Sequence, residues 1–326
     1  MNIIKKEYIG ILLGALYTIL FRYLDGFHFE SVLITIDFSV NSFTFFLLVP
    51  MVVGILPILI AQNEIDNSRW KHFLYPIISN LFFIVYALLF KLEDLGCGII
   101  ILPPLLLVSG IIGLLVGLLL KRKNNNKLYS VLFLPFLFVP IENLITNQDI
   151  SHDVESNIII NNNSTYIWNN IIEVPEIKKH EYQRGFFSYI GIPYPIKSKI
   201  EIIGNEKFRM GYFSDGLILA ESIEEMEPNK MIRFKIHIDK SKLRNTPMDQ
   251  HVLKNDYFQF SSISYHLKQV GNGQTKLTLK CKYKINSMMN AYANFWAYHI
   301  IKDFEVRLLN ALQVKFDRKV LKTVHS

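Results

Sequence analysis

The stretch Gly191–Glu221 reads GIPYPIKSKIEIIGNEKFRMGYFSDGLILAE, and its two runs of β-strand composition meet at Ser214-Asp215-Gly216. The runs are rich in isoleucine, phenylalanine and tyrosine, which suit a pleated and half-buried surface. Serine, aspartate and glycine between them are typical turn residues. A strongly hydrophobic half of the chain precedes this stretch, which opens a more soluble half. It therefore predicts a β-hairpin in a folded second domain.

The register of this hairpin depends on its loop. A three-residue loop, with glycine in the left-handed conformation, would pair Phe213 with Leu217. Counting outward along both strands then brings Arg209 directly opposite Glu221. A two-residue Asp215-Gly216 turn would break this pairing, since a one-residue slip changes every facing partner. The three-residue loop thus predicts an Arg209–Glu221 ion pair on the face that carries Phe213 and Leu217.

Strand-like runs continue on both sides of the hairpin. They lie at about 196–203, 206–213, 217–226, 230–239, 257–269 and 275–285. In the run 230–239, isoleucine and phenylalanine alternate with charged or polar residues, as in a half-buried strand. Asn272-Gly273 separates the last two runs and indicates a hairpin turn. These patterns predict an antiparallel sheet, interrupted at Lys240–Asp256 by a rim loop or lid.

Helical patterns flank the strands. Ser164 or Thr165 can cap a short helix over Tyr166–Ile172, and we expect a second short helix near Glu176–Phe187. A long helix at about 288–318 ends the domain, because apolar residues recur there at intervals of three, four or seven. Its apolar face comprises Met289, Trp296, Ile300, Phe304, Leu308, Leu312 and Phe316. The element order predicts a curved antiparallel sheet wrapped around this long helix.

The first half of the chain predicts an all-α transmembrane bundle of four to five helices. Several runs approach the roughly 20 apolar residues that cross a bilayer. They are Tyr8–Leu24, Ser42–Gln62, His72–Phe90 and Cys97–Leu120, with a shorter fifth run at Leu128–Ile141. Gly10/Gly14 and Gly113/Gly117 have the GxxxG spacing that lets helices approach closely, and we expect packing within the bundle. The apolar runs hold no clear ionisable residue near their centres, which argues against an ion path.

The distribution of positive charge predicts the orientation of the bundle. Basic residues lie near the N-terminus, in the loop 63–71 and most densely in the loop 121–127, which places these segments in the cytoplasm. If Leu128–Ile145 crosses the membrane, as we expect, the C-terminal domain lies on the non-cytoplasmic side. If that segment is re-entrant or interfacial, the domain is cytoplasmic. The predicted location is the cell (inner) membrane, with multiple passes.

Length and charge agree with two domains. The 326 residues suit about two domains, and we expect the bundle at 1–145, a linker at 146–156 and the second domain at 157–320. Lys/Arg and Asp/Glu balance in the first 150 residues, so the net charge of +7 belongs to the second half.

No arginine-rich tract or RNA-binding signature occurs, which argues against nucleic acid as a partner. Two distant cysteines form no disulfide framework and no metal pattern.

The second half resembles the SRPBCC superfamily, which is START-like and related to polyketide cyclases and dehydrases. The matching pieces are Ile167-Trp168-Asn169, Gly191–Ile196, Arg209–Phe213, Asp215-Gly216, Glu221, Pro228, Ile232-Arg233-Phe234 and the closing aromatic helix. The likeness covers about residues 155–318 and extends to bacterial membrane proteins that carry such a domain after several spans. It implies the α+β helix-grip fold and an apolar cavity, since members include lipid carriers, small-molecule binders and cyclases.

If the inward face of the sheet lines that cavity, a small set of residues would contact a ligand. The candidate ligand-binding residues are Arg209, Tyr212, Phe213, Glu221, Tyr283 and Trp296. The Arg209–Glu221 pair could orient a polar ligand head, and the simpler alternative is a structural or surface ion pair. Additional candidates for polar groups in the cup are His237, His266, Tyr292 and His299, although aromatic residues at such spacings usually build the core.

The sequence predicts binding of a small molecule more directly than it predicts catalysis. No G-x-S-x-G, H-E-x-x-H or P-loop motif occurs, and the acids and histidines show no spacing of an acid/base pair. His299 and Asp303 share a helix face without a third ligand, so we expect no metal, and no motif calls for a cofactor. We therefore expect a membrane-anchored domain whose partners are the lipid bilayer and a hydrophobic or amphipathic, lipid-like molecule. The alternatives are a cyclase- or dehydratase-like enzyme on a polyketide-type substrate and a sensory or interaction module.

Overall fold

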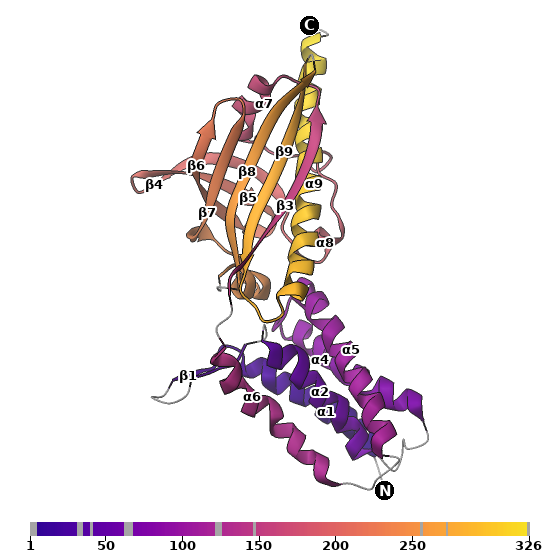
Figure 1. Cartoon of the computed structure of the whole chain (residues 1–326). Coiled ribbons are helices and arrows are strands. Elements are labelled where there is room, and N and C mark those ends of the chain that lie inside the picture. Colours follow the sequence, from indigo (N-terminus) through magenta and orange to yellow (C-terminus); the bar gives the residue numbers. More distant parts are fainter. Residues whose placement is uncertain are drawn as a thin grey trace. The chain divides into compact units, whose positions relative to one another are not determined.

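The chain divides into two compact units. The computed structural model describes residues 5–30, 35–39, 42–61, 68–120, 126–145, 148–254, 257–271 and 273–324. One unit comprises Met1–Gln148 and Ser287–Met289, and the other comprises Asp149–Asn286 and Asn290–Ser326 (Figure 1). Each unit has its own buried core.

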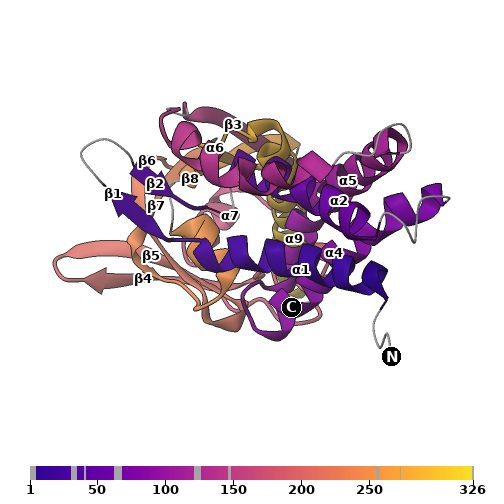
Figure 2. The same ribbon diagram turned by 90° about the horizontal axis from the view of Figure 1, so that it is seen from below.

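The first unit is mainly helical. Its elements are α1 (Lys6–Leu24), β1 (His28–Glu30), β2 (Thr35–Asp37), the π-helical turn η1 (Thr44–Leu48), α2 (Val49–Ile60), α4 (Arg69–Leu89), α5 (Leu95–Leu120), the 3-10 segment η2 (Asn126–Phe133) and α6 (Leu134–Asn143). The helices α1, α2, α4 and α5 lie side by side (Figures 1 and 2). Three of the helices, α1, α4 and α5, are long and apolar enough to cross a membrane.

The two remaining apolar runs form shorter helices. The run predicted at Ser42–Gln62 forms one continuous helix over Thr44–Ile60, and the fifth run forms an apolar helix over Ser130–Asn143. Glu142 joins these two segments, because its carboxylate accepts hydrogen bonds from the backbone N–H groups of Phe43 at 2.6 Å and Thr44 at 3.0 Å. The carboxylate thus caps the start of η1. The basic residues 121–123, on which the predicted orientation depends most, lie outside the described residues.

The helical unit carries polar side chains inside and apolar side chains outside. The Asn80 amide of α4 donates to Ser109 Oγ of α5 at 2.9 Å, and Thr18 Oγ1 of α1 lies 3.4 Å from Asn80 Oδ1. All three side chains are buried. Large exposed side chains follow the outer faces of the same helices, including Leu12, Leu16 and Leu20 of α1, Phe82, Val85 and Leu89 of α4, and Leu107, Ile111 and Leu115 of α5. Polar side chains inside and apolar side chains outside suit a helical bundle in a lipid bilayer.

Glycines bring these helices close together. A Cβ atom on Gly10 of α1 would lie 2.9 Å from Pro57 Cα of α2, and one on Gly54 of α2 would lie 2.7 Å from the Ser109 carbonyl oxygen of α5. Gly113 of α5 similarly faces the Gly54 carbonyl. Gly10 and Gly113, which belong to the two GxxxG spacings, therefore contact neighbouring helices of the same bundle, as the sequence predicts.

The second unit contains a seven-stranded antiparallel sheet and a long C-terminal helix. Its strands are β3 (Ile150–Ile160), β4 (Pro195–Ile203), β5 (Glu206–Phe213), β6 (Ile218–Glu227), β7 (Met231–Lys242), β8 (Phe258–Gly271) and β9 (Gln274–Ile285). Their order across the sheet is β3-β9-β8-β7-β6-β5-β4. The helices are α7 (Ser164–Ile171), the short α8 (Phe186–Tyr189) and α9 (Asn290–Val324). A tight turn η3 (Ser214–Gly216) follows β5, and a π-helical turn η4 (Asp249–Leu253) lies between β7 and β8.

The sheet curves around α9 (Figure 1). The helix packs along β3 and β9 at one edge of the sheet. Near the other edge, the rings of Phe304 on α9 and Phe213 on β5 lie 6.0 Å apart. This arrangement is the curved sheet around a closing helix that the sequence predicts.

Three local predictions differ from the structure. Part of the predicted linker 146–156 belongs to β3, whose inward Val154 and Ser156 alternate with exposed neighbours and are buried. The predicted helix at Glu176–Phe187 is reduced to α8, because the Glu176 and Gln183 carbonyls, which would accept intrahelical bonds, accept from Lys315 Nζ at 2.7 Å and Arg307 Nη1 at 2.8 Å of α9. Asn163, rather than Ser164 or Thr165, caps α7 by accepting from Tyr166 N–H at 2.7 Å.

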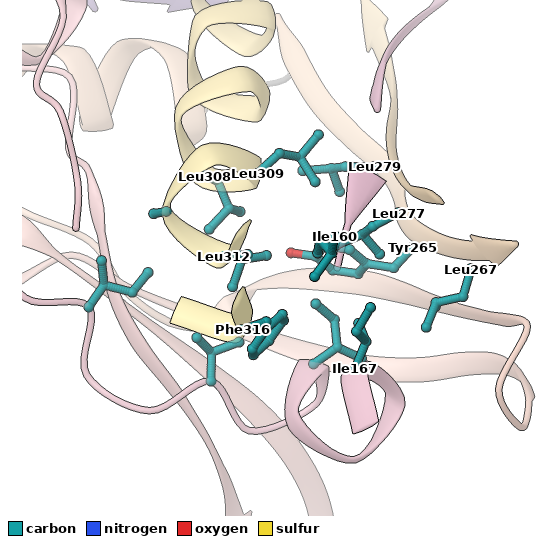
Figure 3. Close-up of a cluster of buried hydrophobic side chains, with 14 of the residues drawn as sticks. Ile160, Ile167, Tyr265, Leu267, Leu277, Leu279, Leu308, Leu309, Leu312 and Phe316 are labelled. Carbon is teal, nitrogen blue, oxygen red and sulfur yellow. The ribbon is translucent and has the colours of Figure 1, made fainter. Parts of the chain in front are cut away.

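A filled hydrophobic core occupies the part of the second unit beside α7 and the C-terminal half of α9. Leu308, Leu309, Leu312 and Phe316 of α9 pack there against the inward side chains of β3, β8 and β9 (Figure 3). We call this group the α9 core. Its sheet and α7 members include Ile160, Ile167, Ile232, Phe234, Tyr265, Leu267, Leu277 and Leu279.

Candidate functional site

The Arg209–Glu221 ion pair forms as predicted. Phe213 N–H bonds to the Leu217 carbonyl at 2.9 Å, and Gly216 adopts a φ of +85°, so the hairpin has the three-residue loop. In the resulting register Arg209 faces Glu221, and Arg209 Nη1 donates to Glu221 Oε2. Both side chains are buried, with only 8% of Arg209 and 5% of Glu221 exposed. The pair is therefore an interior feature and not a surface contact.

Arg209 also holds the end of a helix. Its Nε donates to the Ile172 carbonyl at the C-terminus of α7 at 2.7 Å, and the Ser198 hydroxyl donates to the same carbonyl at 3.1 Å. The guanidinium lies 4.8 Å from the ring centre of Phe234, within the range of a cation–π contact. Glu221, the carbonyl and the ring together compensate the buried charge. The geometry thus gives Arg209 a structural role whether or not a ligand binds.

A second apolar group lies toward the β5–β6 side of the inward face. Its buried members are Leu217, Leu219 and Ile236, and its partly buried members are Phe213, Ile238, Leu243, Leu253, Phe260 and Ile263. We call these nine residues the rim cluster. Unlike the α9 core, most of its members keep accessible surface. An inward apolar surface of this kind is where an apolar molecule would gain most from contact.

The segment between β7 and β8 contributes Leu243 and Leu253 to the rim cluster. Arg244 fixes the segment, because its Nη2 donates to Asp249 Oδ1 at 2.6 Å and its Nη1 donates to the Gly191 carbonyl at 3.1 Å. The described part of this segment thus fits the predicted rim loop, fastened to the turn before β4.

A buried glutamate on α9 lies close to Ser156 of β3 and Cys281 of β9. Glu305 of α9 is 1% exposed, and neither of its carboxylate oxygens has a hydrogen-bond partner in the described part of the chain. Burial raises the pKa of Glu305 to about 7, and the Ser156 hydroxyl, Lys302 and the Cys281 backbone N–H near it offset this rise only in part. Burial also raises the pKa of Tyr265 on β8 to about 12. Glu305 and Tyr265 influence each other electrostatically, as do Tyr265 and Arg209.

The structure brings together three of the six predicted site residues. Arg209, Phe213 and Glu221 share the inward face of β5 and β6. Tyr212 lies on the opposite face, because successive residues of a strand alternate. Its hydroxyl donates to Glu201 Oε1, and its ring packs against the cluster of Phe208, Met210 and Ala220.

The other two predicted residues lie near the start of α9. Tyr283 is inward and buried, and its hydroxyl donates to Asn294 Oδ1 at 2.8 Å. Burial raises the pKa of Tyr283 to about 12. Trp296 packs against Tyr292 and Phe295, and its buried indole N–H lacks a hydrogen-bond partner among the described residues. These two residues lie apart from the Arg209–Glu221 pair in the hairpin.

The histidine candidates do not converge on the inward face. His237 Nε2 lies 2.8 Å from Ser222 Oγ and packs against Phe208 on the outer face of the sheet. His266 lies 3.1 Å from Ser264 Oγ, and His299 is exposed on α9 beside Phe295. Across the residues that the structure describes, no group of three His, Cys, Asp or Glu side chains could hold a metal ion.

Sequence reasoning missed Glu305. A signal was present, since Glu305 stands at the apolar spacing of α9, four residues after Ile301 and three before Leu308. An acidic residue in a position that period 3.6 assigns to the core indicates either a partner across the interface or an unusual pKa.

No family model and no curated protein match this chain. Solved structures with similar folds include an uncharacterised protein of Bacillus thuringiensis, with 13% identity, a TM-score of 0.34, and coverage of 51% of this chain and 98% of that one. The Zhui aromatase/cyclase of Streptomyces shows 13% identity and a TM-score of 0.33, covering 52% and 96%. A truncated norcoclaurine synthase of Thalictrum flavum shows 12% identity and a TM-score of 0.32, covering 51% and 93%. At these scores the likenesses carry no argument about what this chain does.

Proposed function

We propose that this protein is a membrane-anchored START-like domain that binds a hydrophobic or amphipathic small molecule against the inward face of its sheet. One observation carries the proposal: accessible apolar side chains of the rim cluster lie directly beside buried polar groups on the same face. Ligand sites typically combine a mostly apolar lining with a few polar groups that fix orientation. The element order and the motifs around the β5–β6 hairpin support the START-like assignment.

Apolar burial supplies the binding energy in this proposal. A ligand that buries about 400 Å² of apolar surface, at roughly 25 cal/mol per Å², gains on the order of 10 kcal/mol before the entropic cost of association. Phe213 and Phe304, which face each other from β5 and α9, provide part of this surface. The polar groups then determine which end of the ligand enters first.

The helical unit anchors the domain to a membrane in this proposal. Its outward leucines and inward polar network support a hydrocarbon surrounding. The chain from Asn143, where α6 ends, to Ile150, where β3 begins, extends at most about 25 Å. A lipid-like ligand leaving the bilayer would therefore travel a short way through water.

Lipid analysis of the full chain tests the binding function. The protein is extracted into nanodiscs, and its copurified lipids are identified by mass spectrometry before and after replacement of Phe213. Phe213→Ala removes a ring from the rim cluster, and we expect it to reduce copurified ligand several-fold. Phe295→Ala removes a ring of the same size from the exposed face of α9 and serves as the matched control. Failure of the wild-type protein to retain or bind any lipid would refute the proposal.

A cyclase- or dehydratase-like activity is the second candidate, and Glu305 favours it. A carboxyl group whose pKa lies near 7 in an apolar interior has the properties of a general acid or base. Such an enzyme would convert a bound polyketide-type substrate at a rate that Glu305→Gln reduces by about 10²–10⁴-fold. Unchanged turnover of that substrate in the variant would exclude this role for Glu305.

A further inference from the structure

The start of α9 carries an exposed aromatic surface. Phe295 is 53% exposed and Tyr298 is 41% exposed, and Ala291 and His299 on the same side of the helix are exposed as well. The His299 ring joins the two others, because its centre lies 4.6 Å from that of Phe295 and 5.3 Å from that of Tyr298. We call Ala291, Phe295, Tyr298 and His299 the α9 aromatic face. Contiguous exposed apolar surface of this kind marks contact with another surface.

The opposite side of the same helical turns is packed on the sheet. Ala293 and Ala297 pack against a buried cluster that includes Tyr283 and Ile285 of β9. The Tyr283 hydroxyl also donates to Asn294 Oδ1 at 2.8 Å. These contacts fix the rotation of α9 about its axis, so the α9 aromatic face points away from the sheet.

This part of α9 lacks formal charges. The segment Ile285–Ile301 contains no Lys, Arg, Asp or Glu, whereas Lys302–Asp317 of the same helix contains both acidic and basic residues. Entry of the α9 aromatic face into an apolar layer would therefore remove no charged group of the face from water, which is the most costly step of such a transfer. Tyrosine combines an apolar ring with a polar tip, and such rings are enriched where a membrane meets water.

The α9 aromatic face lies at the tethered end of the second unit. Ile150, the first residue of β3, is paired in register with Ile285 of β9. His152 Nε2 lies 3.0 Å from Oδ1 of Asn290, the first residue of α9, so this helix begins beside the start of β3 (Figure 1). Phe295 follows about 8 Å further along the helix axis. Because the chain between α6 and β3 extends at most about 25 Å, the face stays within reach of a membrane that holds α6.

We propose that the α9 aromatic face lies in the headgroup layer of the bilayer and gives the second unit its own, non-covalent contact with the membrane. The inference rests on the membrane anchoring in the proposed function and adds direct lipid contact by the second unit. The tether brings the face close to the membrane, and the rings supply apolar surface for the boundary between headgroups and acyl chains. The absence of charges on the face keeps the cost of desolvation low.

A spin label at Ala291 tests the contact without replacing a ring of the face. The full chain lacking Cys97 and Cys281 carries the label on Ala291→Cys in phosphatidylcholine nanodiscs. The accessibility of the label to oxygen, which concentrates in lipid, is compared with its accessibility to a water-soluble nickel chelate. We expect an oxygen-to-nickel ratio several-fold higher than for a label on Val270→Cys. Val270 is exposed and lies beside the β8–β9 turn, about 33 Å along the sheet from the start of β3.

Paired substitutions test whether the rings carry the contact. Phe295→Asp with Tyr298→Asp should lower the ratio at the α9 label to that of the control label, because both changes place a charge on the face. Phe186→Asp with Tyr189→Asp, at exposed positions of α8 with the same residue types and spacing, is the matched control and should leave the ratio unchanged. The chain before α8 is held by Arg307, about 18 Å beyond Phe295 along α9. Phe295→Ala with Tyr298→Ala removes the rings without adding charge and decides the question if the aspartate pair does not fold.

A label on Leu16→Cys, on the outer face of α1, separates failure of the inference from failure of the anchor. If that label is shielded from nickel while the Ala291 label behaves like the Val270 label, the inference is overturned and the anchor stands. If the Leu16 label is also open to nickel, the membrane anchor of the proposed function is overturned. Low access of both reagents to Ala291, with spin–spin broadening that added unlabelled protein removes, would identify a second copy of the chain as the occupant and overturn the lipid contact.

Discussion

The Arg209–Glu221 pair shows how a charge can be buried at low free-energy cost. Glu221, the Ile172 carbonyl and the face of Phe234 surround the guanidinium on different sides. Removing one member of a buried ion pair leaves the other charge uncompensated, which is more destabilising than removing both. The pair therefore couples the end of α7 to the β5–β6 hairpin.

A double-mutant cycle tests this coupling. We expect Arg209→Met or Glu221→Met alone to reduce the free energy of unfolding by about 3–5 kcal/mol, and the double variant to recover part of the loss. Thermal or denaturant unfolding of the full chain provides the measurement. Arg233 and Glu225, which form a pair with half-exposed side chains at 2.6 Å, provide the control cycle and should show about 1 kcal/mol or less. Additive effects at Arg209 and Glu221 would contradict the structural coupling.

Glu305 predicts a pH dependence of stability. Its folded-state pKa of about 7 lies above the ordinary value of 4.5, so the folded protein binds more protons than the unfolded chain between these values. Stability should therefore fall as pH rises from about 4.5 through 7, by up to on the order of 3 kcal/mol. Tyr265 and Cys281 beside it stay neutral over this range, because burial raises the pKa of each.

Melting temperatures of the full chain between pH 5 and pH 8 measure this effect. The variant Glu305→Gln cannot titrate and should show a flatter profile, with the larger gain over wild type at pH 8. Identical profiles for wild type and variant would show that Glu305 does not titrate in this range.

At the scale of elements, the strands of the second unit follow their sequence pattern closely. The predicted runs 196–203 and 206–213 match β4 and β5, since alternation of side chains is imposed by the pleat itself. The short helix predicted at Glu176–Phe187 was wrong over most of its length, because side chains of α9 bind the Glu176 and Gln183 carbonyls that intrahelical bonds would use. Short helices are governed by such contacts more than by propensity.

The close approach of α2 and α5 predicts that two glycine-to-alanine substitutions in the first unit differ in their effect on stability. Gly54→Ala places a methyl group 2.7 Å from the Ser109 carbonyl oxygen, whereas Gly98→Ala meets its nearest neighbour, a Leu88 methyl group, at 3.7 Å. We expect Gly54→Ala to destabilise the full chain by about 1–3 kcal/mol and Gly98→Ala to be neutral. Thermal unfolding in detergent compares the two, and equal stability would show that α2 and α5 do not approach as closely as described.

At the scale of the whole molecule, the proposed side of the membrane for the second unit depends on the Leu128–Ile145 segment. Three helices are long and apolar enough to span, and the helix over Ser130–Asn143 is shorter. If the Leu128–Ile145 segment crosses, the proposal places the second unit on the non-cytoplasmic side.

Cysteine labelling from each side decides the orientation. A single cysteine at the exposed position Asn161, in a chain lacking Cys97 and Cys281, should react with a membrane-impermeant maleimide added outside intact cells. Lys5→Cys should react only after permeabilisation. Labelling of the second unit only after permeabilisation would place it in the cytoplasm and show that the Leu128–Ile145 segment does not cross.

The sequence by itself determined the two-part architecture and most strand positions, and it reduced the register of the β5–β6 hairpin to a choice between two loop lengths. These features depend on local geometry: a three-residue turn sets the facing pair, and a period of two or 3.6 sets the buried face. Side chains of a strand alternate between the two faces of the sheet, and Arg209 and Tyr212 are three positions apart. The sequence alone therefore places Tyr212 on the face opposite Arg209. Only the tertiary structure decided that Arg209 is buried beneath α7 and that, among the described residues, no donor reaches hydrogen-bonding geometry with the Glu305 oxygens. Burial and hydrogen-bond satisfaction depend on segments far away in the chain, such as α9 packed on β3, and no local pattern records which polar atom such packing leaves unpaired.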